Sequence, residues 1–180
     1  NDAELNRVLI EHLAPPGFAA GRDFSRLPIP FRTVGTDLLT GGRVVLAAGD
    51  LALAVRSSMS VPLAYPAVEW EDSLLVDGGM VENIPVRLAH EMGAEFVIAV
   101  DVSTAIEPDF VPDVLGVTER IVDLLFSANN NRFALEPELL VRPDLGTHSF
   151  ADYSNPEALI EAGRQAALEA LERIPGEFRN

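Results

Sequence analysis

The 180-residue sequence has the length and composition of one globular domain, with 48% hydrophobic residues and with 13 Gly and 13 Pro spread along the chain. Its 28 acidic and 13 basic residues give a net charge of −15, which argues against a nucleic-acid-binding protein, because such a protein presents a basic face. The absence of Cys excludes a disulfide scaffold, a thiol nucleophile and a Cys-ligated metal.

The chain is expected to begin with a helix. Apolar residues at helical spacing predict this helix over residues 2–13. The run Pro15, Pro16 and Gly17 is expected to end it, because proline lacks the N–H that a helix interior needs. Residues 14–30 are therefore expected to form a loop.

A β-hairpin is expected next. A β-branched and aromatic run predicts a strand over residues 29–34, and residues 43–46 predict its partner. Gly41 and Gly42 are interpreted as the turn between them. A phosphate-binding glycine loop would need a helix after it, and a strand follows instead.

Asp50 has the properties of an N-cap for a buried helix over residues 51–59. This helix leads into residues 57–62, which carry three hydroxyl side chains in four positions. The simplest interpretation of these hydroxyls is a polar helix end whose side chains bond to the nearby backbone.

A second hairpin and a crossover are expected in the middle of the chain. Residues 67–70 and 74–76 predict the two strands of the hairpin. A helix is predicted from Pro85 to Met92, because proline favours the first helical turn. Residues 96–100 form a continuous apolar run, which is typical of a strand buried on both faces in a parallel sheet. Together these elements predict a strand–helix–strand crossover.

The last third is expected to hold two helices and a short strand. Asp113 can cap a long helix that reaches about residue 133. Residues 139–141 predict a strand, and Asn155 followed by proline predicts a helix that ends near Arg173. The whole pattern indicates an α/β protein.

Asp77 is the residue most suited to chemistry, because it ends an apolar strand and two glycines, Gly78 and Gly79, follow it. Sites in open α/β sheets form at the carboxyl ends of strands, and glycines leave room for a ligand. A general base, a metal ligand or a plain turn all fit this pattern, since Asp-Gly is a common turn pair. Asp101 also follows an apolar strand, where it is a second carboxylate at the same sheet edge or, more simply, a loop or capping residue.

Metal binding has little support, because the three His residues are scattered along the sequence. No metal, nucleotide or other cofactor is indicated.

Five ordered segments resemble the bacterial branch of the patatin-like phospholipases, which are lipid acyl hydrolases with a Ser-Asp dyad. The strongest resemblance is LLVDGGMVENIPV at residues 74–86. The others are residues 29–37 together with Thr40 and Gly41, and residues 54–62, 93–103 and 140–144. The resemblance extends from about residue 24 to residue 170. It implies a three-layer α/β/α fold with a mainly parallel central sheet whose N-terminal part is missing.

The resemblance assigns Asp77 as the catalytic Asp, which takes the proton of the Ser nucleophile with no His between them. It also implies that the site wall includes the residues that follow Asp77 and the segment after the buried helix. These expected wall residues are Gly78, Gly79, Ser58, Met59, Ser60 and Pro62. The expected partner is a lipid or ester substrate, reached through apolar surface patches that touch a membrane surface or through further segments.

The sequence departs from the family at the nucleophile. None of its nine Ser residues lies in Gly-x-Ser-x-Gly. Residues 1–180 are therefore expected to be the C-terminal portion of one patatin-like domain, inactive alone and completed by the missing N-terminal half or by another copy of the chain. The alternatives are a two-chain enzyme and a non-catalytic binding or regulatory module. Replacement of the nucleophile by Ser57, Ser58 or Ser60 is not expected, because the strained elbow is absent.

Overall fold

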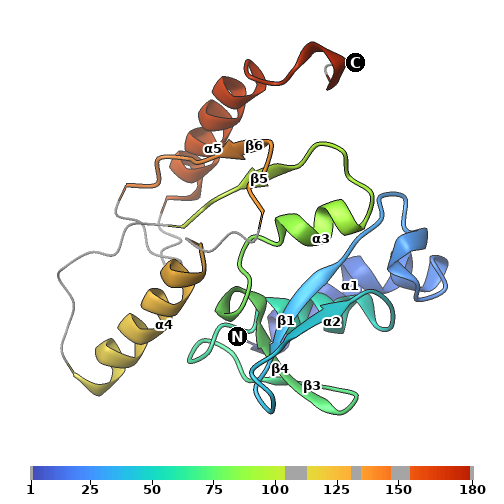
Figure 1. Ribbon diagram of the computed structural model, residues 1–180. Helices are drawn as coiled ribbons and strands as arrows, with labels where there is room; N and C mark the ends of the chain where they lie inside the picture. Colours follow the sequence, from blue (N-terminus) through green and yellow to red (C-terminus); the bar gives the residue numbers. More distant parts are fainter. Residues whose placement is uncertain (1, 104–112, 131–134, 147–154, 179–180) are drawn as a thin grey trace. The chain divides into compact units, whose positions relative to one another are not determined.

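The computed structural model describes residues 2–103, 113–130, 135–146 and 155–178, which fold into two compact units (Figure 1). Unit 1 is Asn1–Asn83 and unit 2 is Ile84–Asn180. Each unit has its own sheet and its own hydrophobic core. The chain is therefore a mixed α/β protein, as its sequence indicates.

Unit 1 is built on a four-stranded antiparallel sheet with the strand order β2-β1-β4-β3. The strands are β1 (Thr33–Asp37), β2 (Arg43–Leu46), β3 (Val68–Trp70) and β4 (Ser73–Asp77). Both expected hairpins are confirmed, although the first strand begins at Thr33 and not at residue 29. Every residue of the central strand β1 is buried, which makes it the middle of the unit.

The expectation of a mainly parallel sheet is not confirmed for the described residues. The larger sheet is antiparallel, because β1–β2 and β3–β4 are joined by short turns, which can link only antiparallel neighbours. The single described parallel pair is β5 (Ile98–Val100) with β6 (Leu139–Val141). Strand β5 pairs with β6 and not with β4, so the expected crossover does not form within one described sheet.

Two helices complete unit 1. Helix α2 (Leu51–Ser58) lies against β1 and β4, and α1 (Asp2–Ala19) packs against α2. Asp50 caps α2 as expected, since its side chain accepts from the Leu53 N–H at 3.0 Å. Two short 3-10 turns, η1 (Phe24–Arg26) and η2 (Gly78–Met80), follow α1 and β4.

The expected end of the first helix at Pro15 is wrong, because α1 continues through Pro15 and Pro16 to Ala19. Each proline removes one helix hydrogen bond, and packing on α2 offsets this loss. Gly17 lies so close to α2 that an added Cβ would be 3.1 Å from Leu51 Cβ. The helix thus continues past both prolines while Gly17 packs against α2.

The core of unit 1 lies between α2 and the sheet. It contains the buried side chains of Phe24, Leu46, Leu51, Ala54 and Leu75. Phe24 is completely buried although residues 14–30 were expected to form a loop. Residues 24–26 form η1 because the Asp23 side chain accepts from the Ser25 N–H and Phe24 anchors the turn in the core.

The described part of unit 2 contains three helices and the parallel strands. The helices are α3 (Val86–Glu91), α4 (Val114–Asn130) and α5 (Pro156–Leu171), and the short turn η3 (Gly176–Phe178) follows. The caps expected at Asp113 and Asn155 are confirmed by their hydrogen bonds to Gly116 and Ala158. The expected continuation of the long helix beyond residue 130 lies outside the described residues.

Two apolar clusters hold unit 2 together. One joins Leu139 and Val141 of β6 to Ala170 of α5, and the other joins Val97 and Ala99 to Val86 of α3. The strand at residues 96–100 is not buried on both faces by the described residues. Ile98 is 48% exposed and Val100 is 53% exposed, because they point away from the face that packs.

Candidate active site

Asp77 is the last residue of β4, and its backbone is held from two sides. Its N–H donates to the Ser60 carbonyl at 3.0 Å, and its carbonyl accepts from the Thr36 hydroxyl at 2.8 Å. Strand β1 also pairs with β4 at this point, with Gly35 opposite Asp77. Strand β1 and the segment after α2 therefore fix the position of this residue.

The carboxylate of Asp77 is much less tightly bound than its backbone. Its Oδ1 accepts from the Gly79 N–H at 2.8 Å, which caps the turn η2. Its Oδ2 has no hydrogen-bond partner within the described part of the chain. Burial raises the pKa of Asp77 above its ordinary value of 3.8, and the Gly79 N–H counteracts this only in part. The carboxylate thus has the properties of a proton acceptor.

The turn that follows Asp77 is shaped by a close approach of two backbones. A Cβ added to Gly78 would lie 2.2 Å from the carbonyl oxygen of Val34, so only glycine fits there. Gly78 and Gly79 are both buried. Their position immediately beside the carboxylate is as the sequence implies, and Gly78 has in addition a packing reason to be glycine.

The segment after α2 contributes mainly backbone to this region. The Ser58 hydroxyl donates to the Val34 carbonyl at 2.7 Å, and the Ser60 carbonyl holds Asp77. Within this segment, the described polar contact with Asp77 comes from Ser60, and not from Met59 or Pro62, which are half-buried. The structure therefore brings part of the expected wall to Asp77.

The hydroxyls of this segment are already bonded, as expected for a polar helix end. Ser57 and Ser60 are completely buried and donate to the carbonyls of Leu53 and Arg56, at 2.8 and 2.7 Å. A nucleophile must be accessible and must donate to its base, so neither hydroxyl suits that role.

Asp101 is confirmed as a loop residue with an ion pair, and it does not share a sheet edge with Asp77. It follows β5 in unit 2, and its buried carboxylate accepts from Arg142 at 2.7 and 3.0 Å. Burial alone would raise the pKa of Asp101, but hydrogen bonds from Ser103 and Arg142 outweigh burial and lower it. This carboxylate is therefore tied to its partners and is a poor proton acceptor.

Two further residues help to hold Asp77, and the sequence around Asp77 does not indicate either of them. Thr36 holds the carbonyl of Asp77 from β1, and Arg56 of α2 donates to the Ser60 hydroxyl. The one available signal for Arg56 is its place in an otherwise apolar helix, where a buried cation requires partners.

Among the described residues, no three His, Asp or Glu side chains gather closely enough to hold a metal ion. A search of the same residues finds no helix with the length and apolar character of a membrane span.

The chain is similar in sequence to several known proteins. The sequence profile of the patatin-like phospholipase family matches residues 2–90. An uncharacterized NTE family protein of Mycobacterium tuberculosis is 28% identical over 184 aligned residues, covering 88% of this chain and 32% of the relative. A second protein of that description and species is 30% identical over 118 residues, covering 62% of this chain and 33% of the relative.

A mammalian protein is also similar over a shorter stretch. Patatin-like phospholipase domain-containing protein 7 of Mus musculus is 37% identical over 93 residues, covering 49% of this chain and 7% of that protein. This chain spans about a third of the length of the mycobacterial relatives.

Proposed function

We propose, since the chain belongs to the patatin-like phospholipase family, that it forms part of a lipid acyl hydrolase of the phospholipase A or esterase type. The observation that carries this proposal is the state of Asp77. Its backbone is fixed, one carboxylate oxygen has no described partner, and burial raises its pKa. A general base needs this combination of fixed position and proton affinity.

In the proposed reaction, Asp77 takes the proton of a Ser hydroxyl while the hydroxyl oxygen bonds to the carbonyl carbon of the ester. The ester C–O bond then breaks, and the departing alcohol takes the proton from Asp77. Water next gives a proton to Asp77 and attacks the acyl-Ser. The Ser oxygen leaves with that proton and the fatty acid is released.

We place the nucleophile outside these 180 residues, in the N-terminal half of the same domain. Support comes from the sequence, in which none of the Ser residues lies in Gly-x-Ser-x-Gly. The burial and bonding of Ser57 and Ser60 point the same way. In this proposal residues 1–180 are the C-terminal portion of a patatin-like domain.

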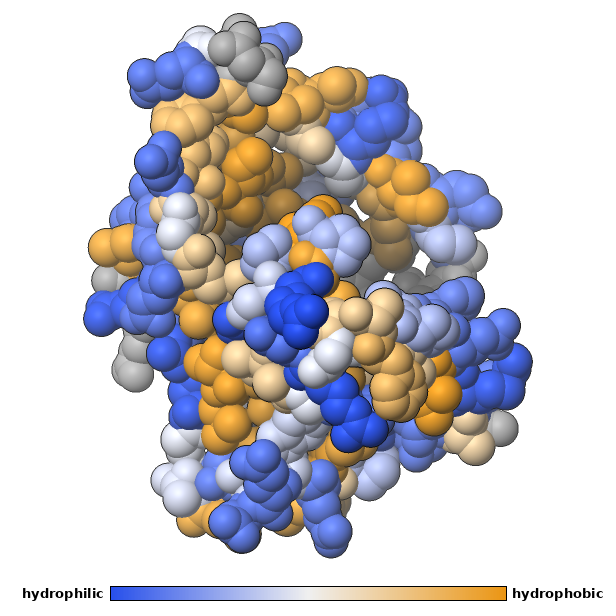
Figure 2. Space-filling view, turned by 90° about the vertical axis from the view of Figure 1, so that its right-hand side faces the viewer, coloured by the Kyte–Doolittle hydropathy of each residue, from blue (hydrophilic) through white to orange (hydrophobic). Residues whose placement is uncertain are grey.

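Lipid is proposed to reach the site through apolar surface contacts and not through charge, because a net charge of −15 repels anionic lipid headgroups. Figure 2 shows hydrophobic areas exposed between hydrophilic ones on one face of the molecule. In unit 1, Phe18, Ile29 and Leu39 are each more than 60% exposed. Large apolar side chains that face water in this way suit contact with a membrane surface.

The absent Gly-x-Ser-x-Gly motif favours one alternative, a patatin-like binding or regulatory module without catalysis. A serine-reactive fluorophosphonate probe separates the two functions in the longer protein that contains these residues. The hydrolase is expected to be labelled, and labelling is expected to slow when Asp77 is replaced by Asn. A protein that is not labelled, although it is folded, would support the non-catalytic module.

A further inference from the structure

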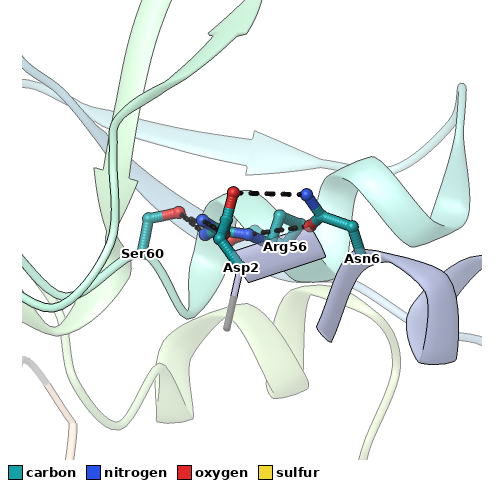
Figure 3. A network of polar contacts seen from close by, with 4 residues as sticks. All are labelled: Asp2, Asn6, Arg56 and Ser60. Carbon is teal, nitrogen blue, oxygen red and sulfur yellow. Dashed lines mark hydrogen bonds and ion pairs between the residues drawn. The ribbon is translucent and has the colours of Figure 1, made fainter. Parts of the chain in front are cut away.

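Arg56 is an almost completely buried cation, held by side chains of α1 and of the segment after α2 (Figure 3). Its Nε donates to Asn6 Oδ1 at 3.1 Å, its Nη2 to Asp2 Oδ1 at 2.6 Å, and its Nη1 to Ser60 Oγ at 2.5 Å. The Tyr65 ring lies against the guanidinium, with its centroid 4.7 Å from Cζ. Desolvation of a cation is costly, so each of these partners helps to keep Arg56 in place.

Ser60 connects this network to Asp77. Its hydroxyl accepts from Arg56 and donates back to the Arg56 carbonyl, while its own carbonyl accepts the Asp77 N–H. Ser60 is completely buried, so no water is at hand to replace a lost partner. A displacement of the guanidinium is therefore passed to Ser60 and from there to the backbone of Asp77.

The positive charge of Arg56 does not act directly on the Asp77 carboxylate. Burial raises the pKa of Asp77, and the one counteracting cause is the hydrogen bond from Gly79. A cation that acted directly on the carboxylate would lower that pKa. What the network supplies to Asp77 is position.

We propose that Arg56 is a positioning residue for Asp77, which it holds through the Ser60 hydroxyl and the Ser60 carbonyl. This inference rests on the proposed function of Asp77 as the general base. Thr36 holds the carbonyl of the same residue, so the position of Asp77 depends on both contacts. Asp2 and Asn6 add the first turn of α1 to the support of the base. Small displacements of a base are costly to turnover, because proton transfer requires hydrogen-bond reach.

Unit 1 offers a matched pair of variants to test this. Ser57 and Ser60 are both completely buried, and both donate to the carbonyl four residues earlier, but only Ser60 accepts from Arg56. In the longer protein that contains these residues, Ser60→Ala is expected to speed hydrogen exchange of the Asp77 amide by about tenfold. Ser57→Ala is expected to change it by less than about twofold. Arg56→Met should behave like Ser60→Ala, and Arg56→Lys should give an intermediate rate because it keeps the charge and loses the fork.

Turnover is measured in the longer protein that contains the nucleophile. Ser60→Ala is expected to lower kcat by about tenfold and to leave KM nearly unchanged. The pH at which activity falls on the acid side should stay the same. Ser57→Ala is expected to keep kcat. Equal effects of the two variants on exchange and on kcat would overturn the positioning role, because they would indicate general loosening. Full turnover by Asp77→Asn would instead remove the proposed function, and the exchange rates would still show whether Arg56 and Ser60 hold Asp77.

Discussion

Three aspartates at or just after strand ends differ in what surrounds their carboxylates. Asp37 at the end of β1 accepts from the Thr40 hydroxyl and from the N–H groups of Leu39 and Leu74, and these bonds lower its pKa. Asp101 is likewise satisfied by its partners, as described above. The Asp77 carboxylate accepts one described hydrogen bond, and burial raises its pKa. The proposed base, Asp77, therefore differs from Asp37 and Asp101 in having fewer hydrogen-bond donors at its carboxylate.

This difference predicts opposite effects on stability. The folded-state pKa of Asp77 is raised, so its ionisation opposes folding at every pH above that pKa and has no effect below the unfolded value of about 3.8. Asp77→Asn, which keeps an acceptor for Gly79, is expected to melt at least as high as the natural chain at pH 7. The difference should shrink as the pH falls toward 4. Thermal unfolding between pH 4 and 7 measures this.

Asp37→Asn is the control with the opposite sign. Its lowered folded-state pKa gives stability that is present above about pH 3.8 and is lost as the pH falls through that pKa. The Asn variant should therefore melt lower at pH 7. A destabilised Asp77→Asn at pH 7 would contradict the account of Asp77.

At the scale of elements, local patterns located most helices and strands, and tertiary contacts decided the rest. The cap at Asp50 and the turn at residues 40–42 are local features, and the sequence was sufficient to find them. The continuation of α1 through Pro15 and Pro16 depends on packing against α2, which a local rule does not contain. The partner of β5 depends in the same way on β6, which follows some forty residues later.

The turn after β4 lies against the backbone of β1 at Gly78. Gly78→Ala would place a methyl group 2.2 Å from the Val34 carbonyl oxygen. This overlap is expected to destabilise unit 1 by about 1–3 kcal/mol, because backbone must shift to relieve it. Chemical denaturation measures the change.

Gly42→Ala is the matched control, since its added Cβ would meet only the Thr40 hydroxyl, at 3.2 Å. The Thr40 hydroxyl also donates to Asp37 at 2.7 Å, so a small shift of this exposed side chain is expected to cost about 0.5–1 kcal/mol, without any backbone shift. A Gly78→Ala variant as stable as Gly42→Ala would show that the two backbones do not approach this closely.

At the scale of the whole molecule, apolar surface remains exposed where the sequence indicates burial. Ile98 and Val100 are 48% and 53% exposed in unit 2, although the run at residues 96–100 is typical of a strand covered on both faces. We propose that a further segment of the longer protein, or another copy of the chain, covers this face. Apolar strand surface left in water favours association.

The 180 residues alone are therefore expected to associate or to precipitate despite a net charge of −15. Replacing Ile98 and Val100 by Thr should reduce this association, because the strand keeps β-branched side chains and loses apolar surface. Light scattering against protein concentration tests it. A monodisperse natural chain that melts cooperatively would count against a missing covering segment.

Only part of the candidate site can be predicted from the sequence, because some of its residues are far apart along the chain. Asp77, Gly78 and Gly79 are adjacent, so their pattern indicates a turn with a carboxylate. The residues that hold Asp77 come from β1 and from the segment after α2, and Arg56 is held by Asp2 and Asn6 from α1. Contacts between such distant positions follow from the fold and leave no local pattern.

The central claim is that Asp77 is the general base of a lipid acyl hydrolase. The most direct measurement is the hydrolysis of a phospholipid and of a short-chain ester by the longer protein, with Asp77→Asn compared with the natural residue and with Asp101→Asn as the control. The account predicts a loss of turnover of at least about 100-fold for Asp77→Asn, the contribution expected of a general base, and retained turnover for Asp101→Asn. Undiminished hydrolysis by a folded Asp77→Asn protein would contradict it.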